Sequence, residues 1–120
     1  MMLVRLAQSI GNALRGFWFV IAHEQNFRLL SGMSVLLLAG GVLFRITARD
    51  FALLIVVIVL VLVLEMINSA FEYFLDLLKP RLMPHVGIVK DIIAGAVLLS
   101  VVGACLVGGI IFWPYIIGAL

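Results

Sequence analysis

Four polar residues follow a long apolar run and set the candidate chemistry of this chain. Glu65, Asn68, Glu72 and Asp76 come directly after residues 51–64, which are apolar without interruption. Because an α-helix turns once in 3.6 residues, spacings of three, four and seven place these side chains along one stripe. One helix is therefore expected to present three carboxylates and an amide on the same face.

Carboxylates gathered in this way favour two kinds of chemistry. They repel one another unless a cation neutralises them, and their oxygens suit Mg²⁺, which usually takes one or two carboxylates with substrate phosphates. A carboxylate in an apolar setting is also a candidate general base. Glu65 is the main candidate, since an ionisable group at membrane depth is costly unless it is paired or hydrated. The alternative for the same pattern is a polar network between helices with ordinary interfacial charges.

The composition places these residues in a membrane protein. Of 120 residues, 66% are apolar and only 12% are charged, whereas soluble domains carry about 25% charged residues. A soluble globular domain of this size is excluded. The net charge of +2 is small and its basic residues are scattered. A nucleic-acid partner is excluded as well, because it requires a dense basic patch.

We predict an all-α integral membrane fold in a single domain over residues 1–120. Crossing the hydrocarbon core takes about 20 helical residues. Three apolar stretches predict transmembrane helices, at about 28–46, 51–78 and 90–117. The third is expected to bend or fray near Pro114. Ahead of them, residues 3–23 repeat polar side chains every three to four positions, which predicts an amphipathic helix on the membrane surface.

Loop charges predict the orientation of this multi-pass chain. Six basic residues lie before the first span or between the second and third, and two lie between the first and second: Arg5, Arg15, Arg28, Lys79, Arg81 and Lys90, against Arg45 and Arg49. The positive-inside rule then places the N-terminus and the segment at 79–91 in the cytoplasm. The acidic end of the second span reaches the same side.

Three further features bear on this cytoplasmic side and on assembly. Glu24, ahead of the first span, is placed to complete a cation site with Glu72; the alternative is a solvated charge beside Arg28. Lys90 is a candidate contact for lipid headgroups or a nucleotide phosphate, and Asp91 is a candidate helix N-cap.

Small residues recur every four positions in the third span, which favours close helix packing and association between chains; they are Ala96, Ser100, Ala104 and Gly108.

A familiar nucleotide-binding motif is missing. Gly11 and Gly16 have the glycine spacing of a P-loop, but Phe17 stands where that motif requires lysine. Any nucleotide site in this chain must therefore be of another kind.

From about Arg5 to Trp113 the chain resembles the small prokaryotic diacylglycerol kinase family, which includes the undecaprenol kinases of Gram-positive bacteria. The resemblance is carried by Glu24-x-x-Phe27-Arg28, by Glu65-x-x-Asn68-Ser69-Ala70-x-Glu72-x-x-x-Asp76 and by Lys90-Asp91-x-x-Ala94-Gly95-Ala96-Val97-Leu98. It implies a homotrimer of three-span subunits in the bacterial inner membrane. It also implies active sites shared between neighbouring subunits at the cytoplasmic interface.

The resemblance implies roles for individual residues by position. Glu65 matches the catalytic base that takes the proton of the lipid hydroxyl, and Asn68 matches an amide that positions this region. Glu24 and Glu72 match the carboxylates that hold a divalent metal. The implied cofactor is therefore Mg²⁺, with ATP as co-substrate.

The implied nucleotide contacts lie outside this acidic group. They are Arg5, Asn12, Lys90 and Asp91. The segment over residues 77–89 departs from the family pattern, because Gly87 and Ile88 stand where members often carry a basic residue. Arg81 is the candidate substitute donor there.

The sequence thus predicts a lipid kinase that transfers the γ-phosphoryl of ATP to the hydroxyl of a membrane lipid. It leaves the choice between diacylglycerol and undecaprenol open, since both are apolar chains with one hydroxyl. The alternative from another class is a non-enzymatic, small oligomeric transporter whose carboxylates carry protons or cations. Ion flux without ATP consumption would identify that alternative.

Overall fold

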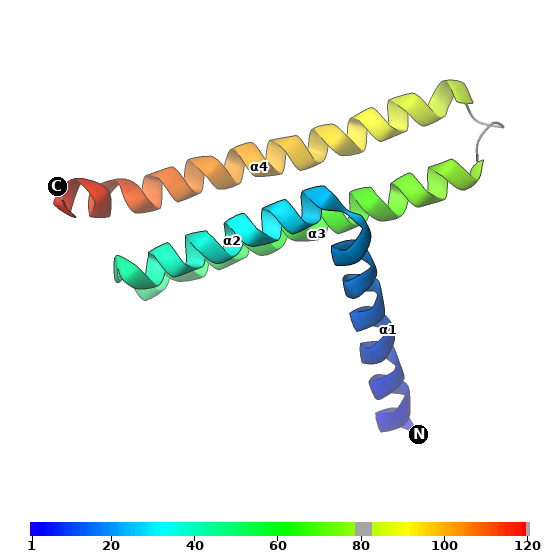
Figure 1. Cartoon of the computed structure of the whole chain (residues 1–120), viewed down its shortest axis with the longest axis horizontal. Coiled ribbons are helices and arrows are strands. Elements are labelled where there is room, and N and C mark those ends of the chain that lie inside the picture. Colours follow the sequence, from blue (N-terminus) through cyan, green and yellow to red (C-terminus); the bar gives the residue numbers. More distant parts are fainter. Residues whose placement is uncertain (79–82, 120) are drawn as a thin grey trace.

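The chain forms four helices, seen in a computed structural model that describes residues 1–78 and 83–119. Their bounds are α1 Met2–His23, α2 Gln25–Leu43, α3 Ala48–Leu78 and α4 Met83–Ala119. Helices α2, α3 and α4 run alongside one another, and α1 leaves them at a steep angle (Figure 1). The predicted order of one leading helix and three long apolar helices is confirmed.

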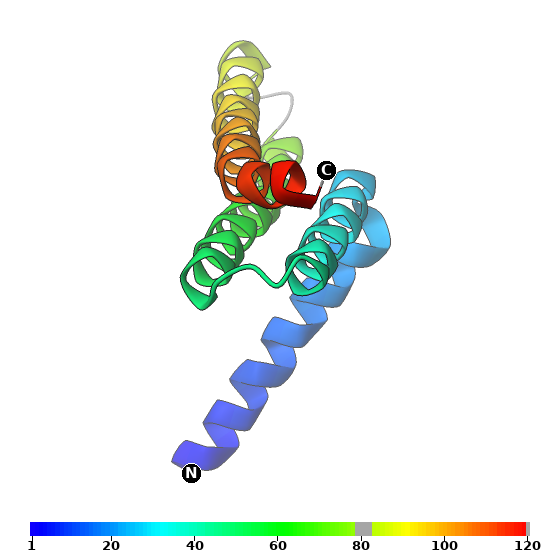
Figure 2. The same cartoon turned by 90° about the vertical axis from the view of Figure 1, so that its left-hand side faces the viewer.

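Three of the described helices are long and apolar enough to cross a membrane. These segments are Gln25–Leu43, Ala48–Leu78 and His85–Ala119. Their outer faces expose many large apolar side chains, as expected where lipid rather than water is the solvent. The chain is therefore a multi-pass membrane protein. Helix α3 occupies the middle position, packing against both α2 and α4 (Figure 2).

Helix α2 ends at Leu43, three residues before the predicted boundary. Arg45 adopts a positive φ of 55°, the left-handed conformation that ends many helices. The N–H of Ile46 then donates to the carbonyl of Gly41 at 3.1 Å, which closes the turn. The prediction had counted apolar residues, whereas the boundary is set by this backbone conformation.

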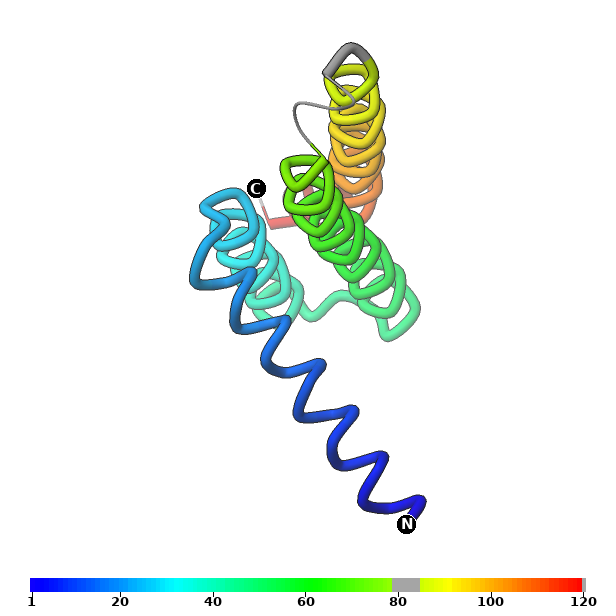
Figure 3. The backbone as a smooth tube through the Cα atoms, turned by 90° about the vertical axis from the view of Figure 1, so that its right-hand side faces the viewer, coloured from blue at the N-terminus to red at the C-terminus, as the bar shows by residue number. Residues whose placement is uncertain are grey.

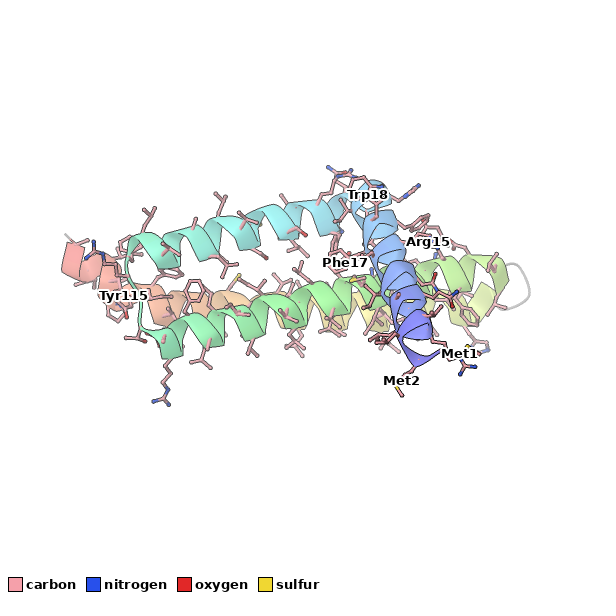
Figure 4. The ribbon with its side chains drawn as sticks, turned by 90° about the horizontal axis from the view of Figure 1, so that it is seen from below. Met1, Met2, Arg15, Phe17, Trp18 and Tyr115 are labelled. Carbon is pink, nitrogen blue, oxygen red and sulfur yellow. The ribbon has the colours of Figure 1, made fainter. Side chains whose placement is uncertain are left out.

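Helix α3 begins at Ala48, also three residues earlier than predicted, because Thr47 caps it. The Thr47 hydroxyl oxygen accepts a hydrogen bond from the N–H of Asp50 at 3.1 Å. The Tyr115 hydroxyl of α4 accepts from the N–H of Thr47 at 3.2 Å and donates to Asp50 Oδ2 at 3.4 Å. Figure 4 shows Tyr115 beside this turn. These contacts hold the end of α4 to the start of α3.

Helix α4 differs from the prediction at its start and agrees with it at its end. It begins at Met83 rather than at about 90, with Pro84 in the first turn, where a helix does not need the proline N–H. Asp91 consequently lies inside the helix, so the predicted N-cap role was wrong. The predicted bend at Pro114 is confirmed, since the final turns leave the line of the helix in Figure 2.

The buried apolar core of the three long helices lies between α3 and α4. Leu54, Ile58 and Ile111 form a buried apolar cluster between α3 and α4. Beside it, α2, α3 and α4 enclose an apolar groove of about 580 Å³, whose lining runs from Leu30 to Ile116 along the chain. This groove lies among the spans. The acidic residues of α3 are not part of its lining.

Candidate functional site

Two buried polar residues lie next to each other in the second half of α3. Glu65 is 4% exposed and Ser69 is 1% exposed. The Ser69 hydroxyl donates to the backbone carbonyl of Glu65 at 3.1 Å, which satisfies the buried serine. No described residue donates a hydrogen bond to the Glu65 carboxylate. Yet the described residues include no fully buried side-chain oxygen without a partner, so the tip of Glu65 stays accessible.

Glu72 and Asn68 continue the polar stripe of α3 and are half-buried. The Asn68 Nδ2 donates to Glu72 Oε1 at 3.4 Å, one helical turn away. Glu72 also lies close enough to Glu65 to act on it electrostatically. The amide thus orients the second carboxylate, while the buried first carboxylate is left without a donor.

Glu24 joins these acids from another part of the chain. It is the single residue between α1 and α2, with extended backbone angles of φ −111° and ψ 109°. Its charge, like that of Glu72, acts on Glu65. Glu24 and Glu72 therefore both lie within electrostatic range of Glu65, although Glu24 belongs to a different segment of the chain.

Aromatic contacts hold α1 and α2 against each other and against α3 at this point. The Phe19 ring stacks on His23 at 4.1 Å and meets Tyr73 of α3 edge-on at 5.3 Å. Phe27 is completely buried and meets Phe17 edge-on at 5.7 Å. In Figure 4 Phe17 lies near the end of α1 that meets α2. Sequence reasoning missed this arrangement, although four aromatic residues within positions 17–27, around Glu24, were a signal.

Arg28 has partners other than Glu24. Its Nη1 donates to the carbonyls of Ile21 at 2.9 Å and Ala22 at 3.0 Å. Within the described residues no ion pair joins Arg28 to Glu24. The charge of Arg28 is therefore directed at the end of α1 rather than at the neighbouring carboxylate.

Lys90 and Asp76 tie α4 to α3 one helical turn beyond Glu72. Their side chains form an ion pair at 2.8 Å. Lys90 thereby lies at the same end of the spans as the acidic residues. Asp91, the next residue, is exposed on α4. The sequence had singled out Lys90 and Asp76 separately and had not paired them.

The remaining predicted nucleotide contacts are not joined to the acidic residues within this chain. Arg5 and Asn12 are exposed on α1, and Asn12 Oδ1 accepts a hydrogen bond from Arg15 at 3.2 Å. Arg81 lies outside the described residues. Among the residues described, no three acids, histidines or cysteines are grouped closely enough to hold a metal ion.

Comparison with known proteins gives the family. The model of the family described as prokaryotic diacylglycerol kinase matches residues 11–112. The chain belongs to this family. The matched range contains Glu24, Glu65, Glu72 and Lys90, whereas Arg5 precedes it. The chain is accordingly a lipid kinase, and the transporter alternative finds no support here.

Two relatives show the extent of the similarity. The undecaprenol kinase of Bacillus subtilis is 30% identical over 110 residues, which cover 92% of this chain and 89% of that protein. The diacylglycerol kinase of Synechocystis sp. is 33% identical over 110 residues, covering 91% of this chain and 63% of that protein. This chain thus spans less than two thirds of the Synechocystis relative. The two relatives are named for different lipid acceptors.

Proposed function

We propose that this lipid kinase transfers the γ-phosphoryl of ATP to the hydroxyl of diacylglycerol or undecaprenol. The observation that carries the proposal is the buried Glu65 of α3, on whose carboxylate the charges of Glu24 and Glu72 act. A phosphoryl-transfer site depends on positioning and on compensation of charge. Carboxylates within electrostatic range of one another supply candidates for both.

Glu65 acts as the general base in this proposal. A base must come within about 2.6–3.2 Å of the hydroxyl whose proton it takes. Glu65 has an accessible carboxylate tip on an otherwise buried side chain, and it follows the apolar part of α3, where a lipid hydroxyl can reach it from the membrane. Asn68 positions the neighbouring Glu72 through its hydrogen bond.

Glu24 and Glu72 would hold Mg²⁺, which on binding offsets the charge of the ATP phosphates. Two carboxylates fit that ion, because Mg²⁺ commonly takes one or two protein carboxylates and completes its shell with water and phosphate oxygens. A set of three protein ligands is not required for such a site. The two residues come from different segments, so their separation depends on how α1 and α2 join.

The nucleotide is proposed to meet α4 and α1 at the cytoplasmic face. Lys90, held beside Asp76 at 2.8 Å, would hold phosphate oxygens, with Asp91 next to it. Arg5 and Asn12 would contact ATP from α1, and Arg81 would serve as a further donor. Because Arg5 and Asn12 are not joined to the acids of their own subunit, a neighbouring subunit is the natural source of these contacts.

A homotrimer in the bacterial inner membrane is part of the proposal. Three spans leave an apolar groove of about 580 Å³ and a stripe of small residues on α4 that a neighbouring helix can fill. Helix α1 runs away from the spans, as a helix in the membrane surface would (Figure 3). The excess of basic residues at this end supports a cytoplasmic N-terminus and active site.

The proposal is tested with purified protein in lipid bilayer discs, supplied with ATP labelled in its γ-phosphoryl. Diacylglycerol and undecaprenol are added separately. The expected result is a labelled phospholipid from at least one of them, dependent on Mg²⁺. Absence of labelled lipid with both acceptors would contradict the proposal, and the same preparation in sealed vesicles would then be tested for cation flux.

A further inference from the structure

The C-terminal end of α1 is closed by a side chain from α2. The last four carbonyls of an α-helix have no partner within the helix. Arg28, in the first turn of α2, donates from Nη1 to two of them, those of Ile21 at 2.9 Å and Ala22 at 3.0 Å. A cation is also favoured at this end by the helix dipole. Arg28 therefore fastens α2 to the end of α1 across Glu24.

Both backbone groups of Glu24 are fixed by the same junction. Its N–H donates to the carbonyl of Val20 at 2.8 Å, and its carbonyl accepts from the N–H of Arg28 at 3.2 Å. The residue between the helices thus has little freedom to turn. The direction of its side chain follows from the angle at which the two helices meet.

The Arg28 guanidinium has hydrogen-bond acceptors other than the Glu24 carboxylate. A guanidinium that paired with this carboxylate would compete with a bound cation, because an ion pair already neutralises the acid. In the structure Arg28 is engaged by the two carbonyls, and no ion pair joins it to Glu24 among the described residues. The backbone of Glu24 is thus held in place while Arg28 leaves its carboxylate without an ion pair among the described residues.

We propose that Arg28 is a positioning residue for Glu24: it locks the junction of α1 and α2 so that Glu24 faces Glu65 and Glu72 of α3. The inference rests on the proposed function, in which Glu24 and Glu72 hold Mg²⁺. Partners that orient a metal ligand commonly change metal affinity by about 10–100-fold when they are removed. Arg28 is expected to have an effect of this size without touching the metal.

The test compares Arg28→Met, which removes the donors, with Arg28→Lys, which keeps a charged donor. Binding of Mn²⁺, as a spectroscopic substitute for Mg²⁺, is measured by electron paramagnetic resonance in bilayer discs without ATP. Arg28→Met should weaken Mn²⁺ binding about tenfold and speed hydrogen exchange at the Glu24 and Arg28 amides. Arg28→Lys should restore most of the affinity. Arg49→Met, at the other end of the spans, is the matched control and should change neither quantity.

Glu24→Gln separates failure of this inference from failure of the proposed metal site. If Glu24→Gln weakens Mn²⁺ binding and Arg28→Met leaves it unchanged, the positioning role is wrong and the metal site stands. If Glu24→Gln has no effect on Mn²⁺ binding, the metal site is wrong and the inference falls with it. A change in KM for ATP without a change in Mn²⁺ binding would instead make Arg28 a nucleotide contact. Should Arg28→Met fail to assemble, Arg28→Leu, which also lacks a donor, replaces it with the same expected result.

Discussion

Glu65 has a buried side chain, and no described residue donates a hydrogen bond to its carboxylate. This combination leads to a prediction about the reaction. Replacing Glu65 by Gln keeps the shape and removes the proton acceptor. General acid–base catalysis contributes roughly 10²–10⁴-fold, so turnover should fall at least a hundredfold while helix content and oligomer size stay unchanged. Lipid phosphorylation at saturating ATP measures the effect. Near-normal turnover would remove Glu65 from the role of base.

Glu24 and Glu72 lead to a second prediction at the residue scale, because they lie on different segments and act on the same neighbour. If they share one Mg²⁺, either Ala substitution should raise the Mg²⁺ concentration needed for half-maximal activity. The double substitution should add little to the more severe single one, as residues that act as a unit are non-additive. Independent sites would give effects that sum. Activity is titrated with Mg²⁺ for both single variants and the double variant.

At the scale of the helices, two glycines of α2 have opposite surroundings. A Cβ on Gly41 would lie 3.0 Å from Ile46 Cδ1 and 3.2 Å from the Phe51 ring, whereas a Cβ on Gly32 would meet no atom within 4 Å. Gly41→Ala should destabilise the chain by about 1–3 kcal/mol through overpacking of the α2–α3 turn. Gly32→Ala, the matched control, should be neutral or stabilising, because alanine is the better helix former. Denaturant unfolding in mixed micelles compares them; equal stabilities would show that the turn adjusts freely.

The whole molecule is proposed to work as a trimer, and subunit mixing tests whether its sites are shared. Glu65→Gln subunits retain Arg5, and Arg5→Ala subunits retain Glu65. If Arg5 of one subunit serves Glu65 of its neighbour, random mixing of the two inactive variants at equal amounts should recover about a quarter of the activity, as expected for head-to-tail contacts in a closed ring. No recovery after mixing would place both residues in the site of a single subunit.

Much of the architecture was determined by the sequence alone, because it depends on local patterns. Apolar length gave the three spans, polar spacing put Glu65, Asn68 and Glu72 on one helix, and the proline at 114 gave the bend. These features need only helical geometry and the preference of apolar residues for lipid. The boundaries were less accurate. Capping by Thr47 and the left-handed Arg45 depend on backbone conformation, which hydrophobicity does not report.

Only the tertiary structure decided which residues act together. In the sequence, Glu24 was equally well explained by a charge beside Arg28, and Lys90 was not paired with Asp76. Folding directs Arg28 to the carbonyls that end α1, brings Glu24 within electrostatic range of Glu65 and joins Lys90 to Asp76 at 2.8 Å. The physical reason is that helical spacing fixes neighbours within one helix, whereas neighbours between helices follow from crossing angles and side-chain packing. The acidic stripe of α3 could therefore be predicted from the sequence. The proximity of Glu24 to this stripe depends on the tertiary fold.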